Sequence, residues 1–244
     1  MSHSDIGLPE GHLGVDGVDG LANAETAGRA GTGSANDAFS ENRVHWAELL
    51  RDGLTFDLAG LQPGPAMPSV EFGQNIGIEP GTSSLSYSAL TLWPGPHLAG
   101  AENTLPVVRA LLQSADDLID GLGNIAAIGW RPASALMGAD YFSQIVTNWA
   151  DGGPFPALGL VTFRPALDGV INSVGLSYFT GQELRIEGEL GVDRAAATRL
   201  AVRLVNELVA AAPIKERIPF IGPDKERLLM EPSANERFLR VWKG

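Results

Sequence analysis

Three short apolar runs separated by turn signals, within residues 152–187, constrain the fold of this chain more than any other feature. The runs cover residues 157–163, 170–179 and 184–190, and tight-turn residues such as Asp168-Gly169 stand between them. Short apolar runs bounded by such turns are typical of neighbouring antiparallel strands. The stretch therefore predicts a three-stranded antiparallel meander.

Apolar and charged side chains alternate in the last of these runs. The apolar positions are Leu184, Ile186 and Leu190, and the charged positions are Glu183, Arg185, Glu187 and Glu189. Because successive side chains of a strand point to opposite faces, one face of this strand is expected to be core and the other solvated or covered by polar groups.

Residues 1–41 differ in composition from the rest of the 244-residue chain. They are rich in Gly, Ala, Ser and Asp, and they hold seven acidic residues against one arginine, Arg29. Such a segment cannot bury enough apolar surface to offset the entropy of ordering it. We therefore expect a disordered acidic tail over residues 1–41 and a single domain over residues 42–244.

The net charge of −12, without a cluster of Lys and Arg, argues against nucleic acid and anionic membrane surfaces as partners. No apolar run approaches the 18 residues of a membrane span, and the first residues lack the pattern of a secretion signal. The chain has no cysteine, which excludes disulfides and thiol chemistry. We expect a cytoplasmic protein.

The rest of the chain alternates helical and strand patterns before ending in consecutive strands. Helices are expected over residues 44–51, 103–121, 138–150 and from Asp193 to before Pro213; strands are expected over residues 54–58, 87–93, 125–131, 218–221, 227–230 and 238–242. Residues 60–82, rich in proline and glycine, are expected to be an irregular connection. This order favours an α+β fold with a mostly antiparallel twisted sheet and helices packed on one face.

No motif in the sequence completes a catalytic, metal or cofactor site. The letters G-x-G-x-x-A occur at residues 121–126, but they follow a helix and enter a strand, which is the reverse of a dinucleotide-binding turn. A glycine helix cap explains them better. No zinc-type histidine pair or nucleophile elbow is present, and His97 in its proline-rich loop is the one histidine of interest. We expect no cofactor, no metal and no catalytic residue.

Four residues are the candidates for a ligand-binding site: Trp130, Arg131, Gln182 and Glu183. Arg131 ends an apolar strand beside an aromatic residue and offers a planar cationic fork for a carboxylate or phosphate. Gln182 and Glu183 follow a glycine turn that lets a partner approach closely. A structural ion pair at Arg131 and a solvated strand face at Glu183 are the alternatives. The hypothesis places the two strand ends side by side in one sheet.

Four segments carry a resemblance to a known family: AAIGWRPA (126–133), GADYF (138–142), GGPFPALGLVTF (152–163) and VGLSYFTGQELRIE (174–187). In these segments the chain resembles a bacterial family known as domain of unknown function 4261, over about residues 85–231. The resemblance implies an α+β domain and supplies no catalytic residues.

Two functions follow from the sequence. The absence of a complete catalytic constellation favours a non-catalytic domain that binds a protein or a small ligand. The alternative is an enzyme of unrecognised type that uses carboxylates and Arg131 in a pocket on the sheet. A cleft joining Glu183 to Arg131 or His97 would favour the enzyme, whereas an apolar surface patch would favour the interaction domain.

Overall fold

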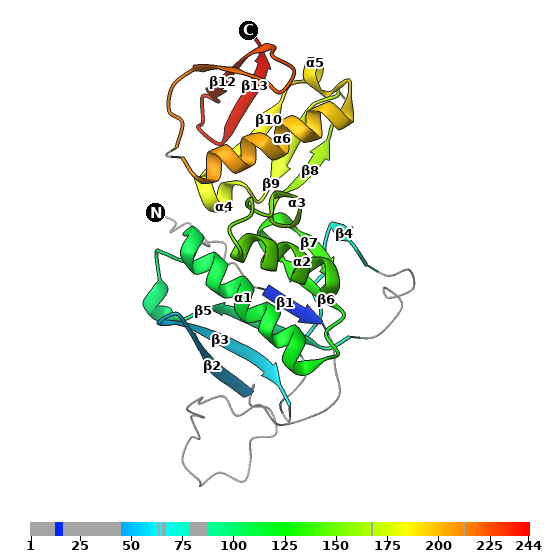
Figure 1. Ribbon diagram of the computed structural model, residues 1–244, viewed down its shortest axis with the longest axis vertical. Helices are drawn as coiled ribbons and strands as arrows, with labels where there is room; N and C mark the ends of the chain where they lie inside the picture. Colours follow the sequence, from blue (N-terminus) through cyan, green and yellow to red (C-terminus); the bar gives the residue numbers. More distant parts are fainter. Residues whose placement is uncertain are drawn as a thin grey trace, which may run out of the picture.

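The computed structural model describes residues 13–16, 45–62, 64, 67–78, 87–166, 168–211 and 213–244. Its strands form two sheets (Figure 1). The larger sheet has the order β2-β3-β5-β1-β6-β7-β4, and the smaller has the order β11-β12-β13-β10-β9-β8. The strands of the larger sheet are β1 (Leu13–Asp16), β2 (His45–Arg51), β3 (Leu54–Leu61), β4 (Gln74–Ile76), β5 (Ala89–Pro94), β6 (Ala127–Trp130) and β7 (Ala135–Gly138). Those of the smaller are β8 (Thr162–Pro165), β9 (Ile171–Val174), β10 (Glu183–Ile186), β11 (Ile218–Ile221), β12 (Arg227–Pro232) and β13 (Phe238–Lys243).

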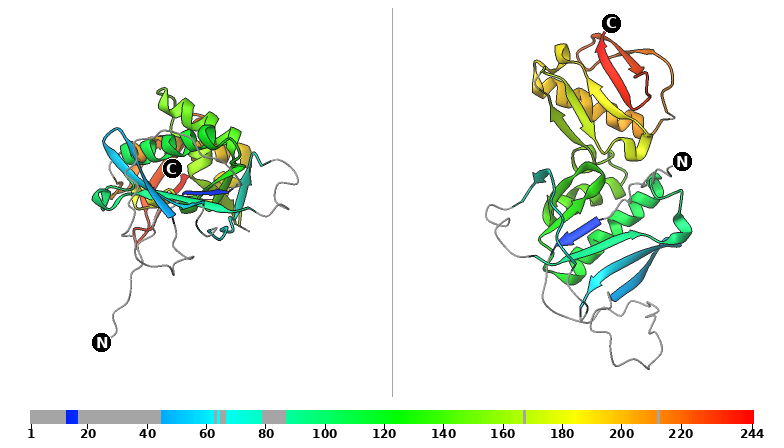
Figure 2. Two further views of the ribbon diagram at one scale, coloured as in Figure 1. Left: turned by 90° about the horizontal axis from the view of Figure 1, so that it is seen from below. Right: turned by 180° about the vertical axis from the view of Figure 1, so that it is seen from behind.

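Three long helices lie on the same side of the two sheets (Figures 1 and 2). They are α1 (Leu105–Leu122) and α2 (Ala139–Ala150) on the larger sheet and α6 (Arg194–Val209) on the smaller. In the described part of the chain the short helices are η2 (Pro96–Leu98), η3 (Arg131–Ala133), α3 (Ala157–Leu160), α4 (Ser177–Thr180) and α5 (Gly188–Gly191). The view from behind in Figure 2 looks onto the strands, with α1 and α6 on the far side.

The α+β class, the mostly antiparallel pairing and the helices on one face are confirmed. Only β4 with β7 and β10 with β13 pair in parallel among the described strands. The expectation of one sheet is wrong, since β6 belongs to the larger sheet and β10 to the smaller. Buried side chains from both sheets nevertheless form one continuous core.

The predicted meander is confirmed as β8, β9 and β10, which pair antiparallel in that order. Its strands are shorter than the apolar runs, because each run also contains a helical turn: α3 precedes β8, α4 follows β9 and α5 follows β10. In β10 the alternation holds, with Leu184 and Ile186 buried. Leu190 is only half-buried, because it lies in α5, beyond the end of the strand.

The helix expected over residues 44–51 is wrong, because this segment is strand β2. The turn Asp52-Gly53 joins β2 to β3, and both of its residues have positive φ, 53° and 80°. A two-residue turn with positive φ at both positions matches the twist of an antiparallel hairpin, and Asp-Gly is a preferred pair for it. The turn therefore overrides a helical spacing that only three residues support.

Four residues of the N-terminal stretch, Leu13–Asp16, form β1 between β5 and β6 in the middle of the larger sheet. The composition predicts disorder at these four residues, and the structure has a paired strand there. The rest of residues 1–41 lies outside the described part of the chain. The irregular connection expected over residues 60–82 also contains a strand, β4.

The other predicted helices and strands lie close to their expected positions, whereas strand β7 was not predicted. Helix α1 ends at Gly123, whose φ of 69° makes it a left-handed cap, as expected for the first half of the G-x-G-x-x-A letters. Helix α6 begins after Asp193, whose side chain accepts a hydrogen bond from the backbone N–H of Ala196. Leu200 on α6 is buried in the shared core, as expected.

Candidate functional site

Trp130, the first predicted site residue, is fully buried where the two sheets meet. Its indole Nε1 donates a hydrogen bond to the carbonyl of Leu160 at 3.1 Å, and its ring contacts Tyr178 edge-on and Phe179 face-on. Burial, with the nearby Glu102 carboxylate, raises the pKa of Tyr178 to about 12, so its hydroxyl stays a proton donor. It donates to the carbonyl of Glu102. These aromatic residues join the two sheets, and the buried ring of Trp130 is not accessible to a ligand.

Glu183, the last predicted site residue, accepts hydrogen bonds at both carboxylate oxygens from residues in β9 and in the turn that follows it. The five donors are the hydroxyls of Ser173 and Ser177 and the backbone N–H groups of Gly175, Leu176 and Ser177. An ionised carboxylate is a strong acceptor for such donors. Glu183 therefore fixes the turn between β9 and α4, and the structure gives it a structural role.

Gln182 and Arg131 differ in their surroundings. Gln182 is buried, and its side-chain Nε2 donates to the carbonyl of Glu236, so it ties β10 to the loop before β13. Arg131 is exposed at the start of η3. Within the described residues no hydrogen bond or ion pair joins Arg131 to Glu183. The strand ends do not share a sheet, although Gly175 packs against Ala133 where the two sheets meet.

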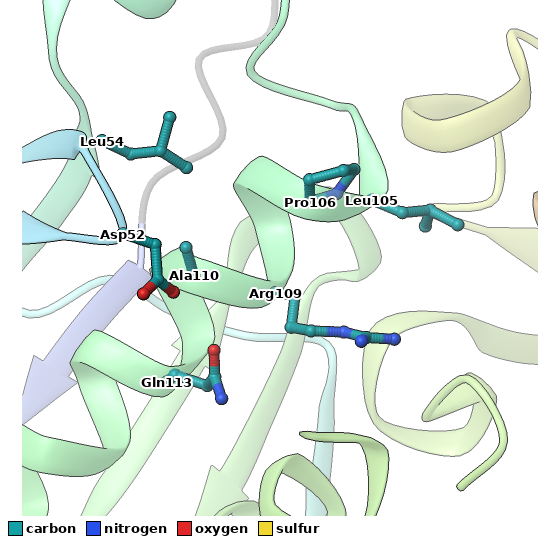
Figure 3. Close-up of a pocket in the computed structure, with 7 residues that line it drawn as sticks. All are labelled: Asp52, Leu54, Leu105, Pro106, Arg109, Ala110 and Gln113. Carbon is teal, nitrogen blue, oxygen red and sulfur yellow. The ribbon is translucent and has the colours of Figure 1, made fainter. Parts of the chain in front are cut away.

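A groove of about 510 Å³ lies between the Asp52-Gly53 hairpin turn and the first half of α1 (Figure 3). It is lined by Asp52, Leu54, Leu105, Pro106, Arg109, Ala110 and Gln113. Its volume falls in the range of small-molecule sites, roughly 300 to 1,000 Å³. The Arg109 guanidinium, however, stacks 4.6 Å from the Trp149 ring and points away from Asp52 and Gln113. The polar groups of the groove therefore do not converge on one point, and neither Arg131 nor Glu183 lines it.

The part of the larger sheet formed by β2, β3 and β5 has its outer face turned away from α1. On β2 this face carries Trp46, Glu48 and Leu50, all three exposed, with 55% of Trp46 and 73% of Leu50 accessible to solvent. The intervening residues Ala47 and Leu49 are half-buried. Large apolar side chains on an exposed sheet face are a common feature of interaction surfaces.

Two carboxylates lie side by side on this face. The strand register places Glu48 directly opposite Asp57 on β3, and Asp57 directly opposite Trp93 on β5. Burial is the main cause that raises the pKa of Asp57, and the neighbouring Glu48 raises it further, while His97 acts in the opposite direction. His97, the histidine singled out by the sequence, reaches the same face, with its Nδ1 3.1 Å from the Thr55 hydroxyl.

Strand β2 is also an edge of the larger sheet, since β3 is its only partner among the described strands. It has seven residues and no proline. The other three edge strands are shorter: β4 has three residues, while β8 and β11 have four each and contain Pro165 and Pro219. Short edges and prolines are the usual protection against unwanted strand pairing. Of the four edges, β2 is therefore the one best able to accept another strand.

Comparisons with family models, with curated proteins and with solved structures give no match to this chain. The family resemblance noted in the sequence therefore stays a prediction. No helix in the described part of the chain is long and apolar enough to cross a membrane. The described residues also contain no group of three His, Cys, Asp or Glu side chains placed to hold a metal ion.

The sequence contains a signal for the exposed face of β2. Asp-Gly between alternating residues is a strong hairpin signal, and it would have placed Trp46, Glu48 and Leu50 on one face of an edge hairpin. The helical spacing of Val44, Ala47 and Leu50 concealed it.

Proposed function

We propose that this protein is an interaction module that binds an extended segment of a partner protein as an extra strand on the edge of β2 that no described strand covers. The observation that carries this proposal is the seven-residue, proline-free edge with Trp46 and Leu50 exposed on one face. We name the β2 edge together with Trp46, Glu48, Leu50 and Asp57 the β2 surface.

The physical basis is strand addition. Alternate residues of an edge strand direct their backbone N–H and C=O groups away from the sheet, and an extended peptide can pair with them. The main-chain bonds supply affinity, and alternate side chains supply specificity. Trp46 and Leu50 are two residues to either side of Glu48, so both contact the same face of an added strand.

The alternative function, an enzyme with Arg131 and carboxylates in a pocket, has less support from the geometry. Such a pocket requires a carboxylate that is free to act on a substrate. Both carboxylate oxygens of Glu183 instead accept structural hydrogen bonds from five donors, and Arg131 lies in η3, which follows a strand of the other sheet.

The test is a selection of seven-residue peptides from a random display library against the immobilised full chain, followed by affinity measurement by fluorescence polarisation. We expect the selected peptides to bind the wild type and to lose at least tenfold in affinity for Trp46→Thr/Leu50→Thr. The matched control is Leu158→Thr, because Leu158 is another exposed large apolar residue and lies in α3, away from β2. Methylation of alternate peptide nitrogens should abolish binding, since it removes main-chain donors.

Two results would overturn the proposal. One is a selection that enriches no binder. The other is a set of binders whose affinity falls with Arg109→Ala, in the groove beside α1, and is unchanged by Trp46→Thr/Leu50→Thr.

A further inference from the structure

The carboxylates of the β2 surface lack the lysine and arginine partners that several other carboxylates in the described part of the chain have, and His97 is the neighbouring group that favours the charged form of Asp57. Glu187, which follows β10, forms ion pairs with Arg185 and Arg240. Glu231 pairs with Arg217, and Asp117 on α1 pairs with Arg51. Among the described residues, no Lys or Arg forms an ion pair with Glu48 or Asp57. Two like charges directly opposite each other on a sheet repel and are unfavourable.

The position of Glu48 between two exposed apolar residues predicts a residue pattern in the partner strand. Trp46 and Leu50 lie two residues before and two residues after Glu48 on the same face of β2. The residue of an added strand that lies opposite Glu48 is therefore flanked, two positions away on each side, by residues opposite Trp46 and Leu50. This holds for a parallel and for an antiparallel strand.

We infer that the partner segment carries the pattern apolar-x-basic-x-apolar, with its Lys or Arg opposite Glu48 and near Asp57. The inference rests on the proposed function and adds to it the chemical class of the partner. A basic side chain neutralises Glu48 across the new strand pair and reaches toward Asp57 on the strand behind it. An arginine also places a flat cation beside the exposed ring of Trp46.

A second copy of this chain does not meet these requirements. Two β2 strands related by a two-fold axis can pair Trp46 with Leu50 on this face only in a register that places the two copies of Glu48 opposite each other. That arrangement brings four carboxylates, from Glu48 and Asp57 of both copies, into one row across the joined sheets. The partner is therefore a different, basic polypeptide segment.

The experiment uses three probe peptides, acetylated and amidated, that differ in their central residue: Thr-Val-Thr-Lys-Thr-Ile-Thr and its versions with Thr or Glu in place of Lys. Each is titrated into the full-length protein and followed by nuclear magnetic resonance, with salt held constant because exposed ion pairs are screened. We expect affinity to fall in the order Lys, Thr, Glu, with at least a fivefold difference between Lys and Glu. Glu48→Gln/Asp57→Asn should bring the three affinities within twofold of one another, and Glu48→Lys should reverse the order.

The outcomes separate the two proposals. Equal binding of all three peptides to wild type, at β2, overturns the basic pattern and leaves strand addition in place. Binding of none of them while library peptides with a different pattern bind at β2 also overturns the basic pattern. A protein that is dimeric in light scattering and becomes monomeric on Leu50→Lys, with Val192→Lys as the control on another exposed residue, shows that a second copy occupies β2 and overturns the inference.

Discussion

Glu48 and Asp57 face each other across β2 and β3, on the side of the larger sheet that α1 does not cover. This pair combines the edge position and the negative charge on which the two proposals depend. It lies on the longest edge strand of either sheet, between two exposed apolar residues. It also gives that edge a local negative charge without a described Lys or Arg partner.

Replacing Glu48 by glutamine should lower the pKa of the Asp57 carboxyl. Glu48 is the second cause of the raised pKa, after burial, so its removal should bring the pKa part of the way back toward the ordinary aspartate value of about 3.9. Carbon-detected nuclear magnetic resonance of the side-chain carboxyl over pH 2 to 7 measures this. Asp140→Asn, on a different face of the protein in α2, should leave the Asp57 titration unchanged. An identical midpoint in wild type and Glu48→Gln would contradict the contact.

The same shift predicts how stability depends on pH. A carboxyl whose folded-state pKa is raised stabilises the fold in its neutral form, and this contribution is lost as pH rises through the folded-state value. Asp57→Asn should therefore raise the melting temperature at pH 7, and the gain should vanish below about pH 4, where the unfolded-state aspartate is also protonated. Thermal unfolding of both proteins at pH 7 and pH 3.5 tests this. A gain of equal size at both pH values would show that the charge of Asp57 is not the cause.

Removing the Glu183 carboxylate should destabilise the protein by about 3 kcal/mol, because Glu183→Ala leaves five donors without their acceptor. Urea unfolding measures the loss. Glu207→Ala removes an exposed carboxylate that is paired only with Arg203, four residues earlier in α6, and should change stability by about 0.5 kcal/mol or less. Equal effects of the two substitutions would mean that Glu183 is not held as the structure shows.

Alanine substitutions at two glycines test how closely the two sheets approach each other: Gly175 lies at their junction, and Gly181 is the control. Both have positive φ, 99° and 78°, so alanine is unfavourable at either position by about 1 kcal/mol. A Cβ at Gly175 would also lie 2.9 Å from Cα and Cβ of Ala133, whereas nothing lies within 4 Å of a Cβ at Gly181. Gly175→Ala should therefore lower stability in urea by at least about 1 kcal/mol more than Gly181→Ala, since overpacking adds 1 to 3 kcal/mol. Equal losses would contradict the close approach of Gly175 to Ala133.

Replacing any one of three core residues by alanine should lower the free energy of unfolding by about 2 to 5 kcal/mol. The three are Leu184, Ile186 and Leu200, all buried in the shared core. Val192→Ala is the control, since 86% of this side chain is exposed. Chemical denaturation provides the comparison. Glu187 is unsuitable as a control, because only 18% of its side chain is exposed and its carboxylate forms ion pairs with Arg185 and Arg240.

The sequence predicted those parts of the fold whose local patterns agree with the final packing. The alternation in Leu184 and Ile186 fixed the register of β10, and the Asp193 cap fixed the start of α6. Where a local pattern was ambiguous, long-range pairing decided: β2 is a strand because β3 pairs with it, and Leu13–Asp16 is a strand because β5 and β6 flank it.

The division into two sheets and the role of Glu183 could not be obtained from the sequence alone. Which strands share a sheet depends on contacts between residues far apart in the chain, such as the parallel pairing of β10 with β13. The sequence shows that Glu183 is charged, but it does not show the five groups that donate hydrogen bonds to this carboxylate. The turn at Gly175 places these donors around Glu183. The Glu48 and Asp57 pair depends in the same way on a hairpin whose first strand, β2, has a helical spacing of apolar residues in the sequence.

The central claim is that the edge of β2 left unpaired by the described strands accepts a strand from a partner, and amide hydrogen exchange of β2 tests it most directly. Exchange is measured at Trp46, Ala47, Glu48, Leu49 and Leu50 in the protein alone and with a saturating amount of the peptide that has Lys at its centre. The outward-facing N–H groups of alternate residues should exchange fast in the free protein and slow by at least tenfold in the complex, while the groups already bonded to β3 change little. Exchange that is unchanged in β2 and slowed instead at α1, beside the groove, would contradict the account.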